Sequence, residues 1–496
     1  MTVPFKNIPA GWRVPLFFAE IDNSQANSGQ QTQRALIIAQ KTAAGTAAQD
    51  VPVICLGLAD AIVKGGAGSM LARMVAKYRA NDPVGELWVL PLVDDGAAVA
   101  AVGSFDFTAA ATAAGVLSLY IGGRLVSMPV LTTQTTGQLA TALVAAVNAI
   151  PAMPVIAAVD GVSTHKVNFT AKNGGLNGND TQIQVNYLGA AGNQVIPTGM
   201  TYTITASATG ATNPSLTTGL ANCMDKPFDF IVFPYTDATS LNAIQAFLND
   251  TAGRWSFNRQ VYGHAMASLR GTVGALTTAG VARNDPHASI MGFNGIPNTA
   301  DECAAAFFGA CAPALRADPG RPMQTLVVQD LLAPPINLQF MQSDQEALLY
   351  SGISTFTTAP DGTIALQNVI TTYQLNGSGQ PDNSYLEIET LFLLMFVLRA
   401  LAVYVTSNFP RMKLAADGTR FAPGSAIVTP RIVKQGIIAL YRSLEYQGYV
   451  QNSAAFAAAV IVEQNAGNPN RLDCLWPGTL IDQLRIFALL AQFKLQ

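Results

Sequence analysis

Charged residues are scarce in this 496-residue chain. Asp, Glu, Lys and Arg make up 12% of it, about half the share in an average soluble protein, whereas hydrophobic residues make up 50%. Because a soluble monomer needs charge on its surface, we expect the chain to cover much of that surface with lipid or with other protein subunits. The net charge is −3, and basic and acidic residues are interspersed. The lack of a basic stripe argues against nucleic acid as a partner.

Cysteine and histidine are also scarce, and neither shows the spacing of a functional site. The five cysteines form no CxxC pair. Cys303 and Cys311 stand two helical turns apart, about 12 Å, which is too far for a disulfide. We therefore expect reduced thiols in the core of a cytosolic protein. The three histidines have no paired spacing for a metal. The N-terminal residues lack the uninterrupted apolar run of a signal peptide.

The sequence also lacks a catalytic motif. The loop KGGAGSM, from Lys64 to Met70, has neither the Walker spacing nor the dinucleotide fingerprint, so we interpret it as a turn between a strand and a helix. His264 and His287 fall in strand-like segments, where a hydrogen-bonded core or strand-end histidine is the usual outcome. Helix capping accounts for Asp237, and turn formation accounts for Asp285. The sequence therefore predicts no enzyme, no metal and no cofactor.

One long hydrophobic run is present. The segment from Ile388 to Phe409 is long enough to span a bilayer, but Arg399 lies at its centre, where a charge costs about 2.5–3.5 kcal/mol. No basic cluster flanks the run to orient it. We interpret it as a helix buried among other subunits, with Arg399 paired to a carboxylate, and we expect no stable membrane insertion.

The order of the other segments predicts a multidomain α/β (α+β) fold. A buried strand at 34–40, a helix from about Met70 to Tyr78 capped by Ser69, and a strand at 86–93 give a βαβ alternation. From about 104 to 220 the chain is rich in Thr, Ala, Gly and Asn and predicts short strands between turns. The α/β pattern then resumes.

We therefore expect an α/β core assembled from discontinuous segments, with a β-rich inserted domain and extended strand arms at both termini. Within the insert, Gly122-Gly123 predicts a hairpin turn and residues 136–148 a helix. The expected parts are an N-terminal linker arm (1–33), core segments (34–103 and 221–385), a β-rich outer insert (104–220), a C-terminal helical inner domain (386–483) and a C-terminal strand arm (484–496).

Both termini are predicted to be hydrophobic strands. RVPLFFAEIDNS carries apolar side chains on both faces, and Pro15 excludes it from the centre of a sheet. The last residues, from Arg485 to Leu495, alternate in the same way. An unpaired apolar strand would aggregate, whereas one that completes a neighbour's sheet gains hydrogen bonds and burial. We predict that the termini contact other subunits through Val14, Leu16, Phe17, Phe18, Ile21, Phe487, Leu489, Phe493 and Leu495.

Five stretches, in order over nearly the whole chain, carry a family resemblance. They are VPLFFAEIDNSQANSG, GAGSMLARMVAKYRANDPVGELWVLPL, the insert with GVLSLYIGGRLVSMPV and FTAKNGGLNGN, NDPHASIMGFNG, and PNRLDCLWPGTLIDQLRIFALLAQFKL. Together they resemble the contractile phage tail sheath proteins of the Mu-like type.

The resemblance implies a structural protein of the virion tail, assembled in the host cytoplasm. It implies hexameric rings stacked helically around a tail tube, with baseplate and tail-terminator proteins as further partners. It also implies that terminal extensions of neighbours complete a small sheet on the C-terminal domain, and that contraction drives the tube through the host envelope. Taken without the resemblance, the residues also fit a self-assembling shell or surface-layer protein, an α/β enzyme with oligomerising tails, or a membrane protein.

Overall fold

The hydrophobic run ALIIAQ forms a central strand of a six-stranded sheet. In the computed structural model, which describes residues 33–494, β1 (Ala35–Gln40) pairs in parallel with a strand on each side. Only β2, at one edge, is antiparallel to its neighbour. The parallel strands follow the order of a doubly wound α/β sheet. The full order is β13 (Ala288–Phe293), β12 (His264–Arg270), β11 (Phe230–Val232), β1, β3 (Leu87–Leu92) and β2 (Val53–Ile54).

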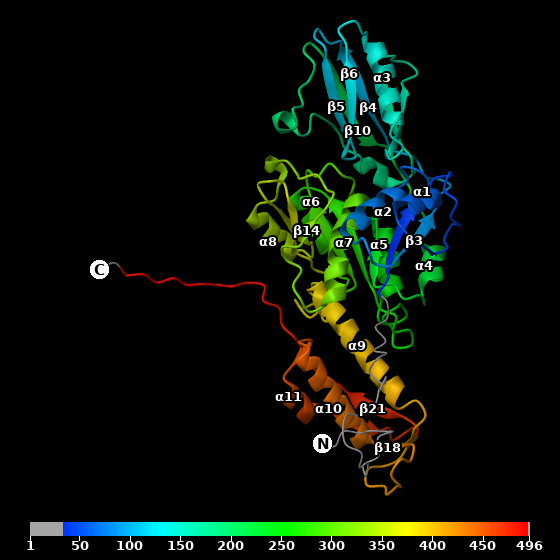
Figure 1. Cartoon of the computed structure of the whole chain (residues 1–496), viewed down its shortest axis with the longest axis vertical. Coiled ribbons are helices and arrows are strands. Elements are labelled where there is room, and N and C mark those ends of the chain that lie inside the picture. The colour runs from blue at the N-terminus through cyan, green and yellow to red at the C-terminus, as the bar shows by residue number, and fades with distance from the viewer. Residues whose placement is uncertain (1–32, 495–496) are drawn as a thin grey trace, which may run out of the picture.

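Helices pack around this sheet and complete what we call the middle body, residues 33–99 and 211–395 (Figure 1). Beside β13 lies a smaller sheet of β14 (Val327–Val328), β16 (Ile364–Asn368) and β15 (Thr355–Thr358). The helices are α1 (Leu58–Gly65), α2 (Met70–Asn81), α4 (Thr217–Cys223), α5 (Ala238–Leu248), α6 (Val273–Val281), α7 (Ala300–Ala317) and α8 (Gln342–Tyr350).

The predicted helix after the glycine-rich loop is confirmed, but the loop itself was misinterpreted. Ser69 caps α2, because its Oγ accepts a hydrogen bond of 3.1 Å from the amide of Ala72. The loop connects α1 to α2, so its interpretation as a turn between a strand and a helix is wrong. The short α1 gives no capping signal in the sequence, because it follows Gly57 and no side chain caps it.

The β-rich segment forms an upper body, residues 102–208, with a hydrophobic core of its own (Figure 1). Its chain leaves and re-enters the middle body side by side, at an antiparallel bridge between Val99 and Ala211. The hairpin turn at Gly122-Gly123 is confirmed, since both glycines have positive φ and join β5 to β6. The helices and strands of the upper body are β4 (Val102–Ala109), β5 (Gly115–Ile121), β6 (Arg124–Val130), α3 (Thr136–Asn148), β7 (Val155–Val159), β8 (Lys166–Ala171), β9 (Ile183–Val185) and β10 (Thr201–Ala208).

Buried ion pairs join the upper body to the middle body. Glu302 of α7 is fully buried and pairs with Arg73 of α2 and with Arg124 at the start of β6. On the other side of the junction, Arg270 of β12 pairs with Asp180 of the upper body. Burial raises the pKa of the Glu302 carboxyl, but Arg124 and Arg73 outweigh that effect and lower the pKa to about 2. A buried network of this kind favours one arrangement of the two bodies, because moving them apart would take Arg124 from Glu302 and Asp180 from Arg270.

Residues 397–480, in the C-terminal part of the chain, form a lower body around the hydrophobic core of α10 and α11 (Figure 1). Its elements are α10 (Pro430–Tyr446), α11 (Ser453–Ala459) and the strand pairs β17 (Lys413–Leu414) with β18 (Ile427–Val428), β19 (Val450–Gln451) with β22 (Thr479–Leu480), and β20 (Ile461–Gln464) with β21 (Leu472–Leu475).

The long hydrophobic run forms α9 (Ile388–Asn408), which connects the middle and lower bodies. Among the described residues it is the one helix whose length and hydropathy would suit a membrane span. Phe392 belongs to the core of the middle body, and Val397 to that of the lower body. The predicted carboxylate partner of Arg399 is Asp229. The chain's own middle body buries the first half of α9, so other subunits are not needed to cover that half.

His264 and His287 lie at hydrogen-bonded core or strand-end positions, as predicted. The predicted burial of the cysteines is confirmed with one exception. His264 is buried with its Nε2 2.8 Å from Ser289 Oγ, and His287 Nε2 lies 3.0 Å from Asp250 Oδ1. Four cysteines are buried, but Cys474 is exposed on β21. The prediction of a core thiol is wrong there, because β21 lies in a two-stranded sheet at the surface.

Candidate subunit interface

The C-terminal arm, residues 484–494, is an extended segment that leaves the folded bodies near the junction of middle and lower body (Figure 1). It pairs with no other strand within residues 33–494. The predicted contact residues Phe487, Leu489 and Phe493 all lie in it. Six of its large hydrophobic side chains are 71–84% exposed: Leu484, Ile486, Phe487, Leu489, Leu490 and Phe493. Such a row of apolar side chains would promote aggregation of a monomer, whereas in an assembly it can bind a neighbouring subunit.

The root of the arm is fixed to the middle body by Arg485. Its guanidinium lies 2.7 Å from Glu389 and 3.0 Å from Glu387, at the start of α9. Burial raises the pKa of the Glu387 carboxyl, and Arg485 opposes that shift. The sequence analysis placed Arg485 on the free strand. The structure instead makes it the anchor from which the free part, residues 486–494, departs. No local pattern reveals this pairing, because the partners lie 96 and 98 positions away.

The predicted N-terminal contact residues lie outside the described part of the chain. These are Val14, Leu16, Phe17, Phe18 and Ile21, and Leu495 lies outside it as well. For these six residues the subunit-contact role stays a prediction.

The lower body carries a small sheet, as the resemblance implied, but the sequence pattern did not locate its strands. β20 and β21 pair antiparallel over four residues each, with Ile461 opposite Leu475. Val462 and Leu472 pack on the core of the lower body, whereas Ile461 and Leu475 are about half exposed. Neither strand has a second partner among residues 33–494. Each therefore presents a free backbone edge to which an extended segment can add by hydrogen bonding.

The lower body also carries a concentration of positive charge, so the interpretation of the charges as evenly interspersed is wrong for this stretch. The stretch 409–442 contains six basic residues and one acidic residue, Asp417, in a chain whose net charge is −3. None of the six forms an ion pair with a described residue. Five are exposed and Lys434 is half-buried. They are Arg411, Lys413, Arg420, Arg431, Lys434 and Arg442.

The carboxyl edge of the parallel sheet, where doubly wound enzymes bind ligands, is largely filled by the chain itself. Gln40, the last residue of β1, donates hydrogen bonds to Asp94 Oδ1 (2.7 Å) and to the carbonyl of Gly174 (2.6 Å), and it accepts one from Tyr235. The cavity left beside Gln40 is about 10 Å³, which is room for one water molecule at most.

A wider hollow of about 420 Å³ lies farther along this edge, and the charged groups in its walls already have partners. Arg270 pairs with Asp180, and Asp301 with Arg73. Asp237 caps α5, as predicted, by accepting from the amide of Ser240. Within residues 33–494 no group of three His, Cys, Asp or Glu side chains is arranged to hold a metal ion.

Comparison with known proteins identifies the family. Residues 209–372 match the phage tail sheath protein central domain, and residues 380–494 match the phage tail sheath C-terminal domain. The chain is 35% identical over 497 residues to the Mu-like prophage FluMu tail sheath protein of Haemophilus influenzae, covering 100% of both chains.

Two solved structures overlap with this chain more loosely. One is the sheath tail protein of Desulfitobacterium hafniense, at 12% identity, with 95% of this chain and 97% of that chain covered and a TM-score of 0.49. The other is the helical sheath of the anti-feeding prophage in the contracted state, at 12% identity, with 98% and 100% covered and a TM-score of 0.45. Both TM-scores are below 0.5, so neither overlap bears on the argument.

A structural role fits a chain that exposes a hydrophobic C-terminal arm and largely fills the edge where doubly wound enzymes bind ligands. Tail sheath proteins are structural proteins of the phage tail, not enzymes. On the two matched domains and the full-length identity to the Haemophilus protein, this chain belongs to the phage tail sheath protein family.

Proposed function

We propose that the chain polymerises as a helical array of hexameric rings around a tail tube, and that the array contracts to drive the tube through the host cell envelope. Assembly takes place in the host cytoplasm, and the product is part of the virion tail. The observation that carries the proposal is the C-terminal arm, whose exposed hydrophobic side chains have no use in an isolated subunit.

The arm links subunits by strand exchange. Its free part, residues 486–494, is nine residues long, so it reaches about 30 Å when extended. We expect it to add to a free edge of the β20–β21 sheet of a neighbouring subunit, while the N-terminal strand of another neighbour adds to the same small sheet. The backbone supplies the hydrogen bonds, and alternate side chains such as Phe487, Leu489 and Phe493 supply the burial.

A single arm gives a weak link. Burying the five large hydrophobic side chains of residues 486–494 contributes about 8–15 kcal/mol, and ordering these nine residues costs about 9–18 kcal/mol. Because the two terms nearly cancel, one exchanged strand does not hold two free subunits together. Several links per subunit, each raising the effective concentration for the next, make the assembly stable. This balance favours a lattice over a dimer.

The basic stretch of the lower body supports a contact with the tail tube. These six positive side chains, which form no ion pair within residues 33–494, fit an acidic protein surface, to which they are attracted over about 10 Å at moderate salt. The proposed partners are therefore copies of the chain itself, the tube protein, and baseplate and tail-terminator proteins at the two ends. Nucleic acid is not among them, and the chain does not insert stably into a membrane.

Deletion of residues 486–496 tests strand exchange and leaves the Arg485 anchor in place. The unmodified chain should give long hollow cylinders with helical striations in negative-stain electron microscopy. The shortened chain should stay soluble with an unchanged melting temperature and form no tubes. Striated tubes from the shortened chain would refute strand exchange by this arm. Flat sheets or closed shells from the unmodified chain would favour a shell or surface-layer protein instead.

A further inference from the structure

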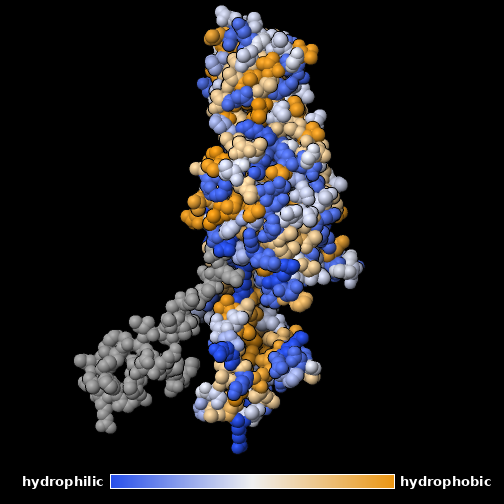
Figure 2. Space-filling model, turned by 90° about the vertical axis from the view of Figure 1, so that its right-hand side faces the viewer, coloured by the Kyte–Doolittle hydropathy of each residue, from blue (hydrophilic) through white to orange (hydrophobic). Residues whose placement is uncertain are grey.

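The roots of the arms lie on the middle body, the β20–β21 sheet lies on the lower body, and α9 connects the two bodies (Figure 1). The 21 residues of α9 include no glycine and no proline, the residues at which helices most often kink, so the helix runs about 31 Å without a break. In Figure 2, hydrophobic residues continue from the middle body into the lower body. The connection between the bodies is therefore stiff along the helix axis.

The lower half of α9 belongs to the hydrophobic core that supports the β20–β21 sheet. Val397 is fully buried in that core, and Phe396 and Leu401 pack against it. Val462 of β20 and Leu472 of β21 pack on the same core. A pull on the sheet therefore reaches α9 through packed side chains.

The first turn of α9 holds the root of the C-terminal arm. Glu389 is fully buried, pairs with Arg485 and accepts a hydrogen bond of 3.0 Å from the amide of Met323. The C-terminal arm is thus attached to α9 directly, in addition to its covalent attachment to β22.

Ten residues farther along, Arg399 connects α9 to the root of the N-terminal arm. Arg399 pairs with Asp229, whose amide donates a hydrogen bond of 2.9 Å to the carbonyl of Arg34, the residue that follows the predicted arm. The amide of Phe230 donates to the same carbonyl, at 3.2 Å. The ring of Phe230 stacks on Phe392 of α9, with the ring centroids 5.0 Å apart. Both outgoing arms are therefore linked to one helix, at sites about 15 Å apart along its axis.

Arg254 stiffens the surroundings of Arg399. It is fully buried and donates hydrogen bonds to the carbonyls of Phe228 (3.1 Å) and Tyr262 (2.8 Å). Each of these two residues is the chain neighbour of a group that Arg399 binds. A planar guanidinium with several fixed acceptors holds the two segments in one relative position.

We propose that α9 transmits the pull between neighbouring subunits, from the strand-accepting sheet of the lower body to the roots of the subunit's own arms. The Arg399–Asp229 pair is the joint to the N-terminal root. The inference rests on the strand exchange of the proposed function, in which a neighbour pulls on the β20–β21 sheet while the arms pull on their own roots. Where stiff and soft connections run in parallel, the stiff one bears most of the force, so α9 spares the rest of the middle body from distortion.

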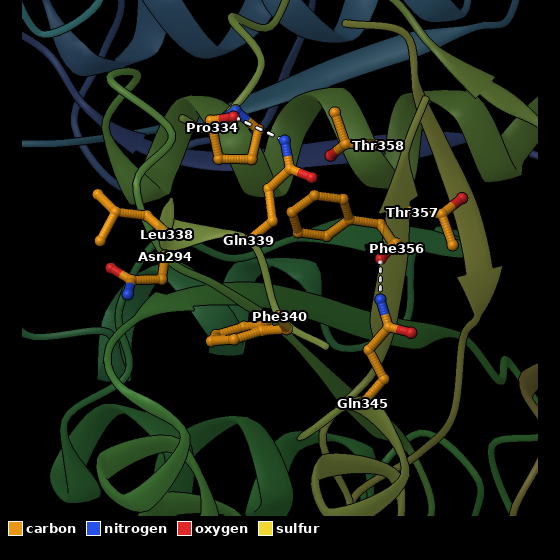
Figure 3. A pocket seen from close by; sticks show the side chains of 9 residues that line it. All are labelled: Asn294, Pro334, Leu338, Gln339, Phe340, Gln345, Phe356, Thr357 and Thr358. Atoms are coloured by element: carbon orange, nitrogen blue, oxygen red, sulfur yellow. Dashed lines mark hydrogen bonds between the residues drawn. The ribbon is translucent and has the colours of Figure 1, made fainter. Parts of the chain in front are cut away.

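The end of the middle body beyond β13 lies off this path. Figure 3 shows a hollow of about 150 Å³ there, lined mainly by polar side chains. Gln339 donates a hydrogen bond of 3.0 Å to the carbonyl of Pro334, and Gln345 donates one of 3.2 Å to the carbonyl of Phe356. Both bonds stay within this end of the body, and neither reaches α9 or the root of an arm.

Pulling on single subunits tests the path without any need for tubes. In a Cys474→Ser background, which removes the exposed native thiol, handles on Ser24→Cys and Ile461→Cys load the path through α9. Handles on Ser24→Cys and Val162→Cys load the junction of middle and upper body instead. Optical tweezers then give the lifetime of the folded subunit at constant force in each direction.

Two matched double variants separate the joint from general stability. Arg399→Met with Asp229→Asn removes the joint and leaves neither charge of the pair buried alone. Arg270→Met with Asp180→Asn does the same for an Arg–Asp pair at the upper junction. The first variant should shorten the lifetime about tenfold or more in the pull through α9 and change it less than about twofold in the other pull, and the second should do the reverse. Arg399→Lys keeps the charge but not the planar fork, so it should give an intermediate lifetime and serves if the double variant does not fold.

Equal shortening in both directions would show that the Arg399–Asp229 pair acts only on general stability, and it would overturn the inference, as would an unchanged lifetime in the pull through α9. The tube assay judges the proposed function separately. The variant without the joint keeps the C-terminal arm and the β20–β21 sheet, so it should form tubes at an unchanged critical concentration, and these tubes should break into shorter lengths under shear. Tubes as resistant to shear as those of the unmodified chain would refute the role of α9 and leave the proposed function standing. Failure of the unmodified chain to form tubes would count against both.

Discussion

The sharpest test of the strand-exchange proposal is Phe487→Ala, because it separates assembly from folding. Phe487 is 79% exposed in the subunit, so its loss should leave the free energy of unfolding of the subunit unchanged within about 0.5 kcal/mol. If the side chain is buried in a neighbour's sheet, its truncation costs about 2–4 kcal/mol per contact, as for other buried aromatic residues at interfaces. Since 1.4 kcal/mol corresponds to a factor of ten, the critical concentration should rise about 30- to 700-fold.

The assay needs two measurements on the same preparation. Pelleting over a range of protein concentrations gives the critical concentration, and thermal unfolding of the unassembled subunit gives its melting temperature. Tyr446→Ala is the control, because Tyr446 is 94% exposed at the end of α10 and outside the arm. A critical concentration within threefold of that of the unmodified chain would refute burial of Phe487 in a neighbour. A lower melting temperature would show that the side chain packs on its own subunit.

Two further predictions concern the stability of the subunit and its dependence on pH. Glu302→Gln should lower the stability by about 3–5 kcal/mol in chemical unfolding, because it leaves Arg124 without its carboxylate and removes one of the two carboxylates, Asp301 and Glu302, that pair with Arg73. With the pKa of Glu302 lowered to about 2, the stabilisation it gives is present above pH 4.5 and is lost as the pH falls towards 2. Burial lowers the pKa of His264 to about 3, so the unfolded chain takes up a proton below pH 6.5 while the folded chain does not. Stability should therefore fall by about 2 kcal/mol between pH 6.5 and 5, and His264→Gln should remove this slope; an unchanged slope would contradict the assignment.

Local features of the fold were predictable from the sequence, and pairings between distant segments were not. The strand predicted at 34–40, which the structure shows at 35–40, the cap at Ser69 and the hairpin turn at Gly122-Gly123 each depend on neighbouring residues, and each is confirmed. The helix α1 was missed because it has neither a capping side chain nor a long hydrophobic period. The carboxylate partner of Arg399 was expected, since a buried charge needs one, but its identity as Asp229, 170 positions earlier, is set by the tertiary fold alone.

At the candidate subunit interface, too, local features were predictable from the sequence and pairings between distant segments were not. The exposed row of Phe487, Leu489 and Phe493 follows from alternation in the sequence, and the structure shows these side chains exposed. The free edges of β20 and β21 did not follow, because two strands of four residues give little periodicity to detect. Arg485 was assigned to the wrong part of the arm for another reason. A charged residue in an alternating run fits a strand, and only the fold brings Glu387 and Glu389 to it.

The fixed anchor and the free arm together meet a requirement of any sheath that changes length. Subunits must stay linked while their bodies move past one another, so the link has to combine a firm attachment with reach. Arg485 supplies the attachment, since its ion pair with Glu389 is buried and costs several kcal/mol to break. Residues 486–494 supply a reach of about 30 Å. Under the strand-exchange proposal, contacts between bodies can then form or separate without loss of the neighbour, because several exchanged strands together maintain the connection.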